Sequence, residues 1–213
     1  IKIENLWVKE KKEIYRNPVR PLVDSLDSFP FPARELYYKR YKFLKEFPTK
    51  RFITSRGCPY NCTFCFNHVM RQMYKDKGKP VRIRSPENIV EEINHIRKEY
   101  GLKTVRFSDD TFTLNHKWLL EFLDVYKKKV NLPFTCLCRA NELNEEVVKK
   151  MKQSNCASTT FGIETGNEEL RNKILRKNLT DAQIVNAAKL LRKYGLKFGT
   201  YNMIGLPGET IED

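Results

Sequence analysis

Residues 51–65 of the sequence read RFITSRGCPYNCTFC, a short apolar run that leads into a loop with three cysteines. Cys58, Cys62 and Cys65 have the spacing C-x3-C-x2-C. Cysteine thiolates are soft ligands that suit iron–sulfur clusters and zinc. A 4Fe–4S cluster bound only by cysteine normally receives one thiolate per iron. Three thiolates therefore leave one iron open, and an open coordination position indicates a catalytic rather than a structural metal site.

A structural zinc site is the alternative interpretation of the same loop. His68 follows Cys65 by three residues and could complete a closed site of three cysteines and one histidine. The net charge of +14, with six basic residues and one acidic residue in 71–84, would then fit a zinc module that binds nucleic acid. The cluster is favoured because a long series of strands and helices follows the loop, which small zinc modules lack. We expect 71–84 to be a solvated surface loop and expect no nucleic-acid partner.

The composition is that of a globular domain in a reducing compartment. Hydrophobic residues make up 40% of the 213 residues, which is ordinary for a soluble fold. No apolar stretch reaches the ~18 residues that a membrane helix needs. Of the six cysteines, three are clustered and none belongs to an evident disulfide framework. We therefore expect a cytoplasmic protein without a membrane partner.

From residue 51 onward the sequence alternates between strand and helix patterns. Helix starts are marked by Ser85 before a proline, by Asn115, by Asn144 and by a capping box at Thr180. The expected helices cover 86–100, 116–129, 145–153, 168–175 and 181–194. The expected strands cover 51–55, 104–107, 133–138, 157–163 and 197–204. This alternation predicts a parallel sheet, because a right-handed helical crossover returns the chain to the same edge.

Residues suited to binding or catalysis lie just past the carboxyl ends of these strands. They are the cysteine loop, Ser108–Asp110, Arg139 with Asn141, Glu164 and the turn Gly205–Gly208. Five strand ends that contribute to one mouth indicate a barrel. The crevice of an open, doubly wound sheet would draw mainly on two neighbouring strand ends. The predicted fold class is therefore α/β, a partial (β/α)6 TIM-like barrel that stops after strand five.

Residues 1–50 do not show the pattern of a domain. Their apolar residues are scattered, and Phe29–Arg34 contains two prolines that stiffen the chain. We expect 1–50 to be an irregular linker from a missing upstream domain and 51–213 to be the core. Residues 209–213 have the acidic pattern of a helix start. A six-strand barrel would need that helix and one more strand, so we expect the core to be incomplete.

The chain resembles the radical S-adenosylmethionine (SAM) enzymes, and among them most closely the cobalamin-binding branch. The resemblance covers 51–213 and depends on the C-x3-C-x2-C loop with an aromatic residue, Phe64, before the last cysteine. It implies a 4Fe–4S cluster on Cys58, Cys62 and Cys65, whose open iron chelates the amino and carboxylate groups of SAM. A one-electron reductant such as flavodoxin or ferredoxin would then drive cleavage of SAM to methionine and a 5′-deoxyadenosyl radical.

That radical would abstract hydrogen from a small-molecule substrate that the sequence does not reveal. The resemblance further implies cobalamin, held by the missing upstream domain, and cobalamin-linked methyl transfer or rearrangement. The segment around Phe29–Arg34 is similar to the linker between the cobalamin domain and the radical barrel in that branch.

The resemblance also assigns contacts to SAM. It puts Phe64 against the adenine, Ser108, Asp109 and Asp110 at the methionyl amino group, Glu164 at the ribose, Arg176 at the carboxylate, and Ile204 and Gly205 in an adenine-binding turn. Arg139 is a further candidate for cofactor binding. Tyr201 replaces the first glycine of the adenine motif. Each residue type has a structural alternative, because the aspartates can cap a turn, Arg176 can lie on a helix surface, and a glycine can serve a tight turn.

Three further cysteines, Cys136, Cys138 and Cys156, suggest either a second cluster or core packing. Buried cysteine packs as a small hydrophobe, and Cys136 and Cys138 alternate on one face of the third strand. We therefore expect core packing. Radical methylthiotransferases use a second cluster, so that activity is a weaker alternative for this chain.

Overall fold

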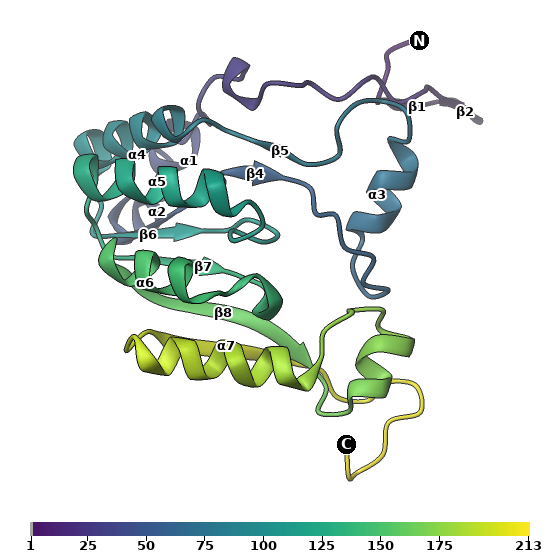
Figure 1. Ribbon diagram of the computed structural model, residues 1–213. Coiled ribbons are helices and arrows are strands. Elements are labelled where there is room, and N and C mark those ends of the chain that lie inside the picture. Colours follow the sequence, from purple (N-terminus) through teal and green to yellow (C-terminus); the bar gives the residue numbers. More distant parts are fainter. Residues whose placement is uncertain (1) are drawn as a thin grey trace.

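The computed structural model describes residues 2–213 and has a five-stranded parallel sheet at its centre (Figure 1). The strands pair in chain order: β3 (Thr49–Phe52), β6 (Thr104–Phe107), β7 (Phe134–Leu137), β8 (Cys156–Glu164) and β9 (Lys197–Asn202). All four pairings are parallel. Sequential parallel pairing is the layout of an incomplete barrel, so the predicted α/β fold class is confirmed.

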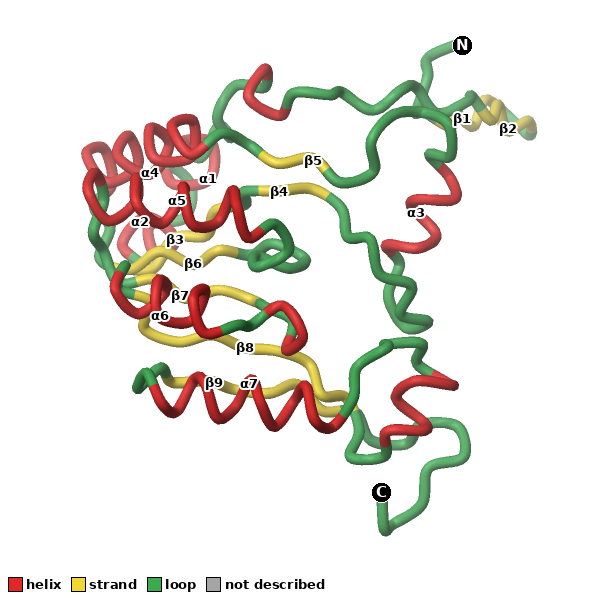
Figure 2. Tube along the Cα trace, in the orientation of Figure 1, coloured by secondary structure: helices red, strands yellow, loops and turns green. Residues whose placement is uncertain are grey.

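Four long helices cover the outer face of this sheet (Figures 1 and 2). They are α4 (Pro86–Tyr100), α5 (His116–Lys129), α6 (Glu145–Gln153) and α7 (Asp181–Lys193). Each begins at a predicted cap whose side-chain oxygen accepts a backbone N–H of the first turn: Ser85, Asn115, Asn144 and Thr180. The helix starts were predictable because capping is a local interaction. None of the helices in residues 2–213 combines the length and the apolar character that crossing a bilayer requires.

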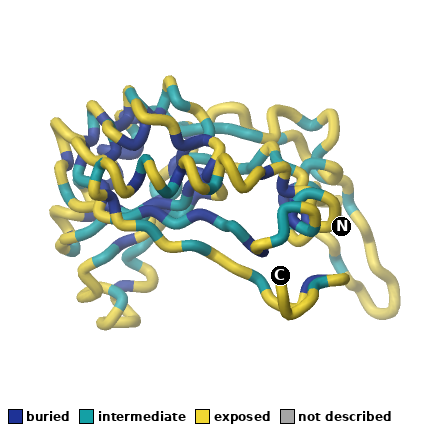
Figure 3. The backbone as a smooth tube through the Cα atoms, turned by 60° about the horizontal axis from the view of Figure 1, so that its bottom comes forward, coloured by how far each residue is buried: buried dark blue, intermediate teal, exposed yellow. Residues whose placement is uncertain are grey.

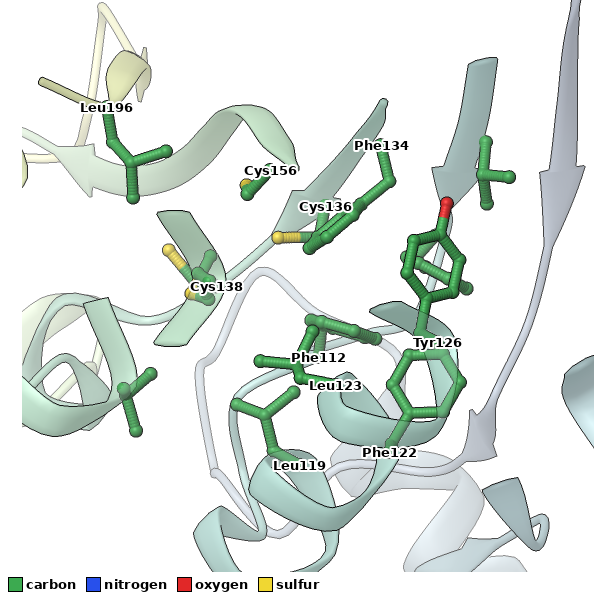
Figure 4. Packing of buried hydrophobic residues seen from close by; sticks show 14 of the residues in the cluster. Phe112, Leu119, Phe122, Leu123, Tyr126, Phe134, Cys136, Cys138, Cys156 and Leu196 are labelled. Carbon is green, nitrogen blue, oxygen red and sulfur yellow. The ribbon is translucent and has the colours of Figure 1, made fainter. Parts of the chain in front are cut away.

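The core between the sheet and the helices is rich in aromatic rings (Figure 4). Phe107 stacks on Phe112 with ring centroids 4.7 Å apart and meets Phe122 and Phe134 edge-on at 5.4 Å each. Offset stacked and edge-to-face pairs are the favourable aromatic geometries. The same core contains Cys136, Cys138 and Cys156, so the prediction that these cysteines fill the core is confirmed.

The first strand differs from its prediction. The ladder with β6 ends at Phe52 instead of residue 55, and Ser55–Arg56 form a separate strand, β4, antiparallel to β5 (Arg82–Ile83). The cause is Asp109, whose Oδ1 accepts the backbone N–H groups of Thr54 (2.9 Å) and Ser55 (2.6 Å) and both of their hydroxyls. A backbone N–H taken by a side chain cannot serve the ladder, so the chain leaves the sheet there.

Two other predicted ends also shift. The helix expected over 168–175 is a short π-helix, Leu170–Ile174, and the last strand ends at Asn202 instead of 204. The ends of helices and strands are the hardest features to predict from sequence, because tertiary contacts decide where they stop.

The segment before β3 has little core of its own (Figure 3). It contains an exposed hairpin of β1 (Trp7–Glu10) and β2 (Glu13–Arg16), then the 3-10 turn Leu26–Ser28 and the short helices α1 (Glu35–Tyr38) and α2 (Lys42–Glu46). β3 begins at Thr49, two residues before the predicted start of the core. The role of 1–50 as a linker from an upstream domain stays a prediction.

One buried ion pair attaches this segment to the barrel. The Glu92 carboxylate on α4 is 1% exposed and contacts Arg34 at 2.9 Å and Arg84 at 2.6 Å. Arg34 precedes α1, and Arg84 precedes α4. Both guanidinium groups are mostly buried, with 16% and 13% of the side chain exposed. The carboxylate therefore holds two positive charges that would otherwise repel each other.

We expect Glu92→Gln to lower the free energy of unfolding by about 3 kcal/mol, because it leaves two buried guanidinium groups without a counter-charge. The matched control is Glu91→Gln, since Glu91 is the exposed neighbour on the same helix. Its effect should stay within about 0.5 kcal/mol. Denaturant unfolding followed by circular dichroism measures both. Equal effects of the two variants would contradict this role of Glu92.

Candidate cofactor site

The carboxyl ends of the strands meet at one end of the sheet, beside the cysteine loop and α3 (Asn67–Met73) (Figure 1). A cavity of about 190 Å³ lies there, and we call it the cysteine cavity. It is lined by all three cysteines of the loop. The predicted site residues that join them are Phe64, Asp110, Arg139 and Glu164. The structure thus brings together residues that are about 100 positions apart in the chain.

The cysteine loop is held by bonds to its backbone. The Arg71 guanidinium donates to the carbonyl oxygens of Cys58 (2.7 Å) and Tyr60 (3.1 Å). The backbone N–H of Thr63 donates to the carbonyl of Leu175 at 3.0 Å. At Gly57 the backbone has φ +86°, and an added Cβ would lie 2.1 Å from the carbonyl oxygen of Pro80. Only glycine fits this entrance to the loop.

Tyr60 ties the loop to the third strand end. Its hydroxyl donates to Glu142 at 2.9 Å, and the Arg139 guanidinium lies 3.8 Å from its ring centroid. Burial, helped by the negative Glu142, raises the pKa of Tyr60 to about 12. Arg139 also donates to the carbonyl of Lys177. Arg139 therefore cross-links the cysteine loop to the segment after β8 and forms a wall of the cavity.

The donors around the sulfur atoms fit an iron–sulfur cluster. The Asn67 amide donates to the Cys65 sulfur at 3.4 Å, and an Arg139 N–H lies 3.9 Å from the Cys62 sulfur. Hydrogen bonds to cysteine sulfur are one means by which proteins tune such clusters. Burial raises the pKa of the Cys58 thiol to about 11, so a metal has to displace its proton. Within residues 2–213 no three His, Cys, Asp or Glu side chains lie together at metal-binding distance.

Glu164 occupies the end of β8 opposite the cysteines. Its carboxylate contacts Lys177 Nζ at 2.7 Å, and both side chains are less than a tenth exposed. Glu164 has φ +72°, an uncommon backbone conformation for a side chain of this size. An added Cβ on Gly162 would lie 1.9 Å from the Glu164 carboxylate, so this glycine makes room for it. Lys177 Nζ also lies 5.7 Å from the Phe64 ring centroid, which joins three segments in one wall.

The predicted triplet after β6 separates into three environments. Asp109 is buried and bonds to Thr54 and Ser55, which assigns it a structural role. Burial raises the pKa of its carboxyl group. Asp110 is exposed and lines the cysteine cavity. Ser108 lines a different cavity, beside the edge of β3. Of the three, only Asp110 lies where SAM contact is expected, and the role of Ser108 stays a prediction.

Two predicted residues lie in a neighbouring hollow. Ile204 is 97% exposed, and Gly205 has φ +84°. Both line a hollow that shares Glu164 with the cysteine cavity. Their turn is closed by Glu209, whose carboxylate accepts the backbone N–H of Leu206 at 2.9 Å. Their contact with adenine stays a prediction.

Arg176 and His68 do not line the cysteine cavity. They line a separate hollow together with Arg71. His68 thus lines a different hollow from the three cysteines, whereas the zinc interpretation requires it beside them. Lys177, adjacent to Arg176, lies in the cysteine cavity instead. Sequence reasoning missed Lys177, because nothing in the local sequence shows which of two adjacent basic side chains turns inward. The assignment of Arg176 to the SAM carboxylate stays a prediction.

A family model described as the radical SAM superfamily matches residues 52–213. The chain belongs to the radical SAM superfamily. This membership confirms the predicted family and its cofactors, a 4Fe–4S cluster and SAM. It also favours the cluster over the zinc interpretation of the cysteine loop.

Relatives of known sequence extend over nearly the whole chain. An uncharacterized methyltransferase of Pyrococcus horikoshii is 35% identical over 213 residues, which is 99% of this chain and 45% of the relative. Cytidylyl-2-hydroxyethylphosphonate methyltransferase of Streptomyces wedmorensis is 28% identical, over 92% of this chain and 39% of the relative. The chain therefore spans less than half the length of these two relatives.

Solved structures share the fold. The radical SAM methyltransferase TsrM of Kitasatospora setae superposes with a TM-score of 0.75 at 18% identity, covering 99% of this chain and 42% of TsrM. Coproporphyrinogen III oxidase of Escherichia coli gives a TM-score of 0.58 at 16% identity, covering 87% and 43%. At these identities the likeness shows the radical SAM barrel and nothing finer.

The two adjacent aspartates provide a matched test. We expect Asp109→Ala to lower the free energy of unfolding by about 2–4 kcal/mol, because it leaves buried donors of Thr54 and Ser55 without an acceptor. Asp110→Ala should change stability by less than about 0.5 kcal/mol and should weaken SAM binding instead. Chemical denaturation and SAM titration measure the two effects. The reverse pattern would mean that the two roles are exchanged.

We expect Glu164→Gln to weaken SAM binding by about 1–3 kcal/mol, because a hydrogen bond to a charged group is lost. The glutamine keeps an acceptor for Lys177, so the iron content of the protein should stay unchanged. Glu169→Gln is the control, since Glu169 is exposed and pairs with Lys173 four residues on. Titration of anaerobically reconstituted protein measures the affinity. An unchanged affinity for SAM in Glu164→Gln would mean that Glu164 serves only to pair with Lys177.

Proposed function

We propose that this chain is the radical-generating core of a cobalamin-linked radical SAM methyltransferase that acts on a small molecule. The observation that carries the proposal is the cysteine cavity, where the three cysteines of the loop face Asp110 and the Glu164–Lys177 pair across the strand ends. This arrangement offers soft ligands for a cluster beside carboxylates suited to an ammonium group and to ribose hydroxyls.

The relatives support methyl transfer. Proteins from Pyrococcus horikoshii and Streptomyces wedmorensis that match this chain are named as methyltransferases. TsrM, which shares the fold, has been solved with cobalamin and a 4Fe–4S cluster, and also with tryptophan and a SAM analogue. The upstream cobalamin domain, the one-electron reductant and the small-molecule substrate of this chain are parts of the proposal.

Each residue of the cysteine cavity has a proposed task. Cys58, Cys62 and Cys65 hold the cluster, which supplies the electron for SAM cleavage when it is bound. The Asp110 carboxylate accepts hydrogen bonds from the methionyl ammonium group. The Glu164 carboxylate accepts the ribose hydroxyls and is oriented by its bond from Lys177.

Two further residues shape the surroundings. The Arg139 guanidinium puts a positive charge 3.9 Å from the Cys62 sulfur and stabilises negative charge there. Phe64 is 45% exposed and therefore free to pack against the adenine ring.

A methylthiotransferase is the second candidate. A putative methylthiotransferase of Methanocaldococcus jannaschii is 28% identical over 99% of this chain and 46% of the relative. That activity uses a second cluster, yet Cys136, Cys138 and Cys156 are buried in the core. The described residues therefore offer no second cysteine triplet for a cluster.

We expect Cys58→Ala, Cys62→Ala and Cys65→Ala each to lose most of the iron after anaerobic reconstitution, because each removes one thiolate ligand of the cluster. The controls are Cys136→Ala, Cys156→Ala and His68→Ala, which should retain iron. Iron and zinc analysis with the visible absorption spectrum measures the outcome. Loss of iron in the His68→Ala variant, or zinc in place of iron in the wild type, would contradict a cluster with an open iron.

A further inference from the structure

A second and larger cavity, of about 650 Å³, lies between residues 26–34 and the edge of the sheet. In Figure 1 this segment passes along β5 and β4 before it reaches α1. Five arginines line the cavity, so we call it the arginine cavity: Arg34, Arg51, Arg56, Arg82 and Arg84. Neither the proposed radical chemistry nor the cysteine cavity uses these residues.

The arginine cavity carries a large positive charge. Its five arginines face one acidic residue, Glu92, so the balance is 5 − 1 = +4. Glu92 is already paired with Arg34 and Arg84. Arg82 donates one N–H to the carbonyl of Val23 at 2.8 Å, which is a neutral acceptor. The charge is therefore not neutralised by the residues that surround it.

Several guanidinium donors in this cavity have no acceptor among residues 2–213. The Nε atoms of Arg34 and Arg82 are buried and unpaired. Arg51 and Arg56 are exposed at the edge of the cavity and make no side-chain hydrogen bond or ion pair. Buried polar groups are nearly always paired, so an unpaired donor in a cavity points to a missing acceptor.

Strand register brings the arginines close together. Arg56 on β4 lies directly opposite Arg82 on the antiparallel strand β5. Like charges directly opposite each other on neighbouring strands are destabilising. An anion bound between them would remove that repulsion, so the arrangement favours anion binding.

The remaining walls are apolar and stiff. Phe29, Phe31 and Phe52 line the cavity with Pro30 and Pro32. Prolines fix the backbone, so the cavity keeps its shape without a ligand. The walls therefore suit an organic group that is attached to the anion.

A third hollow shares lining residues with both the arginine cavity and the cysteine cavity. Arg56 and Arg82 also line a hollow of about 350 Å³ that reaches Asp110. Asp110 in turn lines the cysteine cavity. A ligand anchored at the arginines could therefore extend along this hollow toward the site of radical formation.

We propose that the arginine cavity binds the phosphate group of a phosphorylated organic substrate. Arginine is suited to phosphate because its planar fork donates two parallel hydrogen bonds to the oxygens, and phosphate carries up to two charges. The substrate role rests on the proposed function, whereas phosphate binding itself does not need the cluster. The two ideas can therefore fail separately.

The test uses the whole chain and inorganic phosphate as the probe. Arginine Nε–H signals in ¹H–¹⁵N spectra report on the guanidinium groups directly. We expect phosphate to shift the signals of Arg34 and Arg82. The double variant Arg51→Gln/Arg56→Gln should raise the dissociation constant at least about tenfold, because two charged donors are lost. A thermal unfolding midpoint near that of the wild type shows that this variant is folded.

The charge-matched control is Arg40→Gln/Arg192→Gln. Both arginines are exposed and lie outside the cavity. This control should bind phosphate like the wild type. Equal weakening by both double variants would mean non-specific attraction and would overturn the proposal, as would the absence of any shift.

Two competitors identify the source of the phosphate. Acetate should shift the same signals much less than phosphate, and equal shifts would make the site a carboxylate site. Hydroxocobalamin contains a phosphodiester. Its displacement of phosphate from the arginines would assign the cavity to the cofactor and overturn the substrate assignment.

Discussion

The rest of this structure depends on the hydrogen bonds that the Asp109 carboxylate accepts from Thr54 and Ser55. This carboxylate lies at the end of β6 and takes the backbone N–H groups of Thr54 and Ser55, at 2.9 and 2.6 Å, where the chain leaves β3. These bonds end β3 and direct the chain into β4. They also set where the cysteine loop begins, since Cys58 follows Ser55 by three residues. The site for the cluster is thus positioned by a residue that does not touch it.

Much of the fold could be predicted, because its determinants are local. Helix caps such as Ser85 and Asn144 are recognised from a few neighbouring residues, and the structure uses them as expected. The cysteine spacing is likewise contained within one loop. What could not be predicted depends on contacts across the sheet. Asp109 and Asp110 are alike in sequence, and only the position of Thr54 in space separates the structural residue from the one in the cavity. Lys177 and Arg176 differ in the same way.

The site is built from pieces that stabilise one another. Arg139 packs on Tyr60 and bonds to the chain after β8, while Glu164 pairs with Lys177 from the same segment. The wall opposite the cysteines therefore depends on residues 176–178, where Arg176 and Asn178 have φ +50°. This backbone is uncommon for residues with side chains, so the surrounding contacts must hold it. The same contacts join the cysteine loop to the segment after β8, so the two sides of the cavity hold each other in place.

Within the five-stranded sheet each strand pairs with the next strand of that sheet along the chain, which has a consequence for how the protein folds. Each parallel pairing closes a loop that contains at least one helix, so the sheet can grow by one strand at a time as the chain is synthesised. The longest step is the first one, because the β3–β6 ladder and the bond from Thr54 to Asp109 both join residues 55 positions apart. The cysteine loop is therefore synthesised before β6, which fixes its start, and before Arg139 and Leu175, which hold it from later strand ends. The cavity around the three thiols is complete only after β8 and β9 have been synthesised, because both strands contribute residues to its lining.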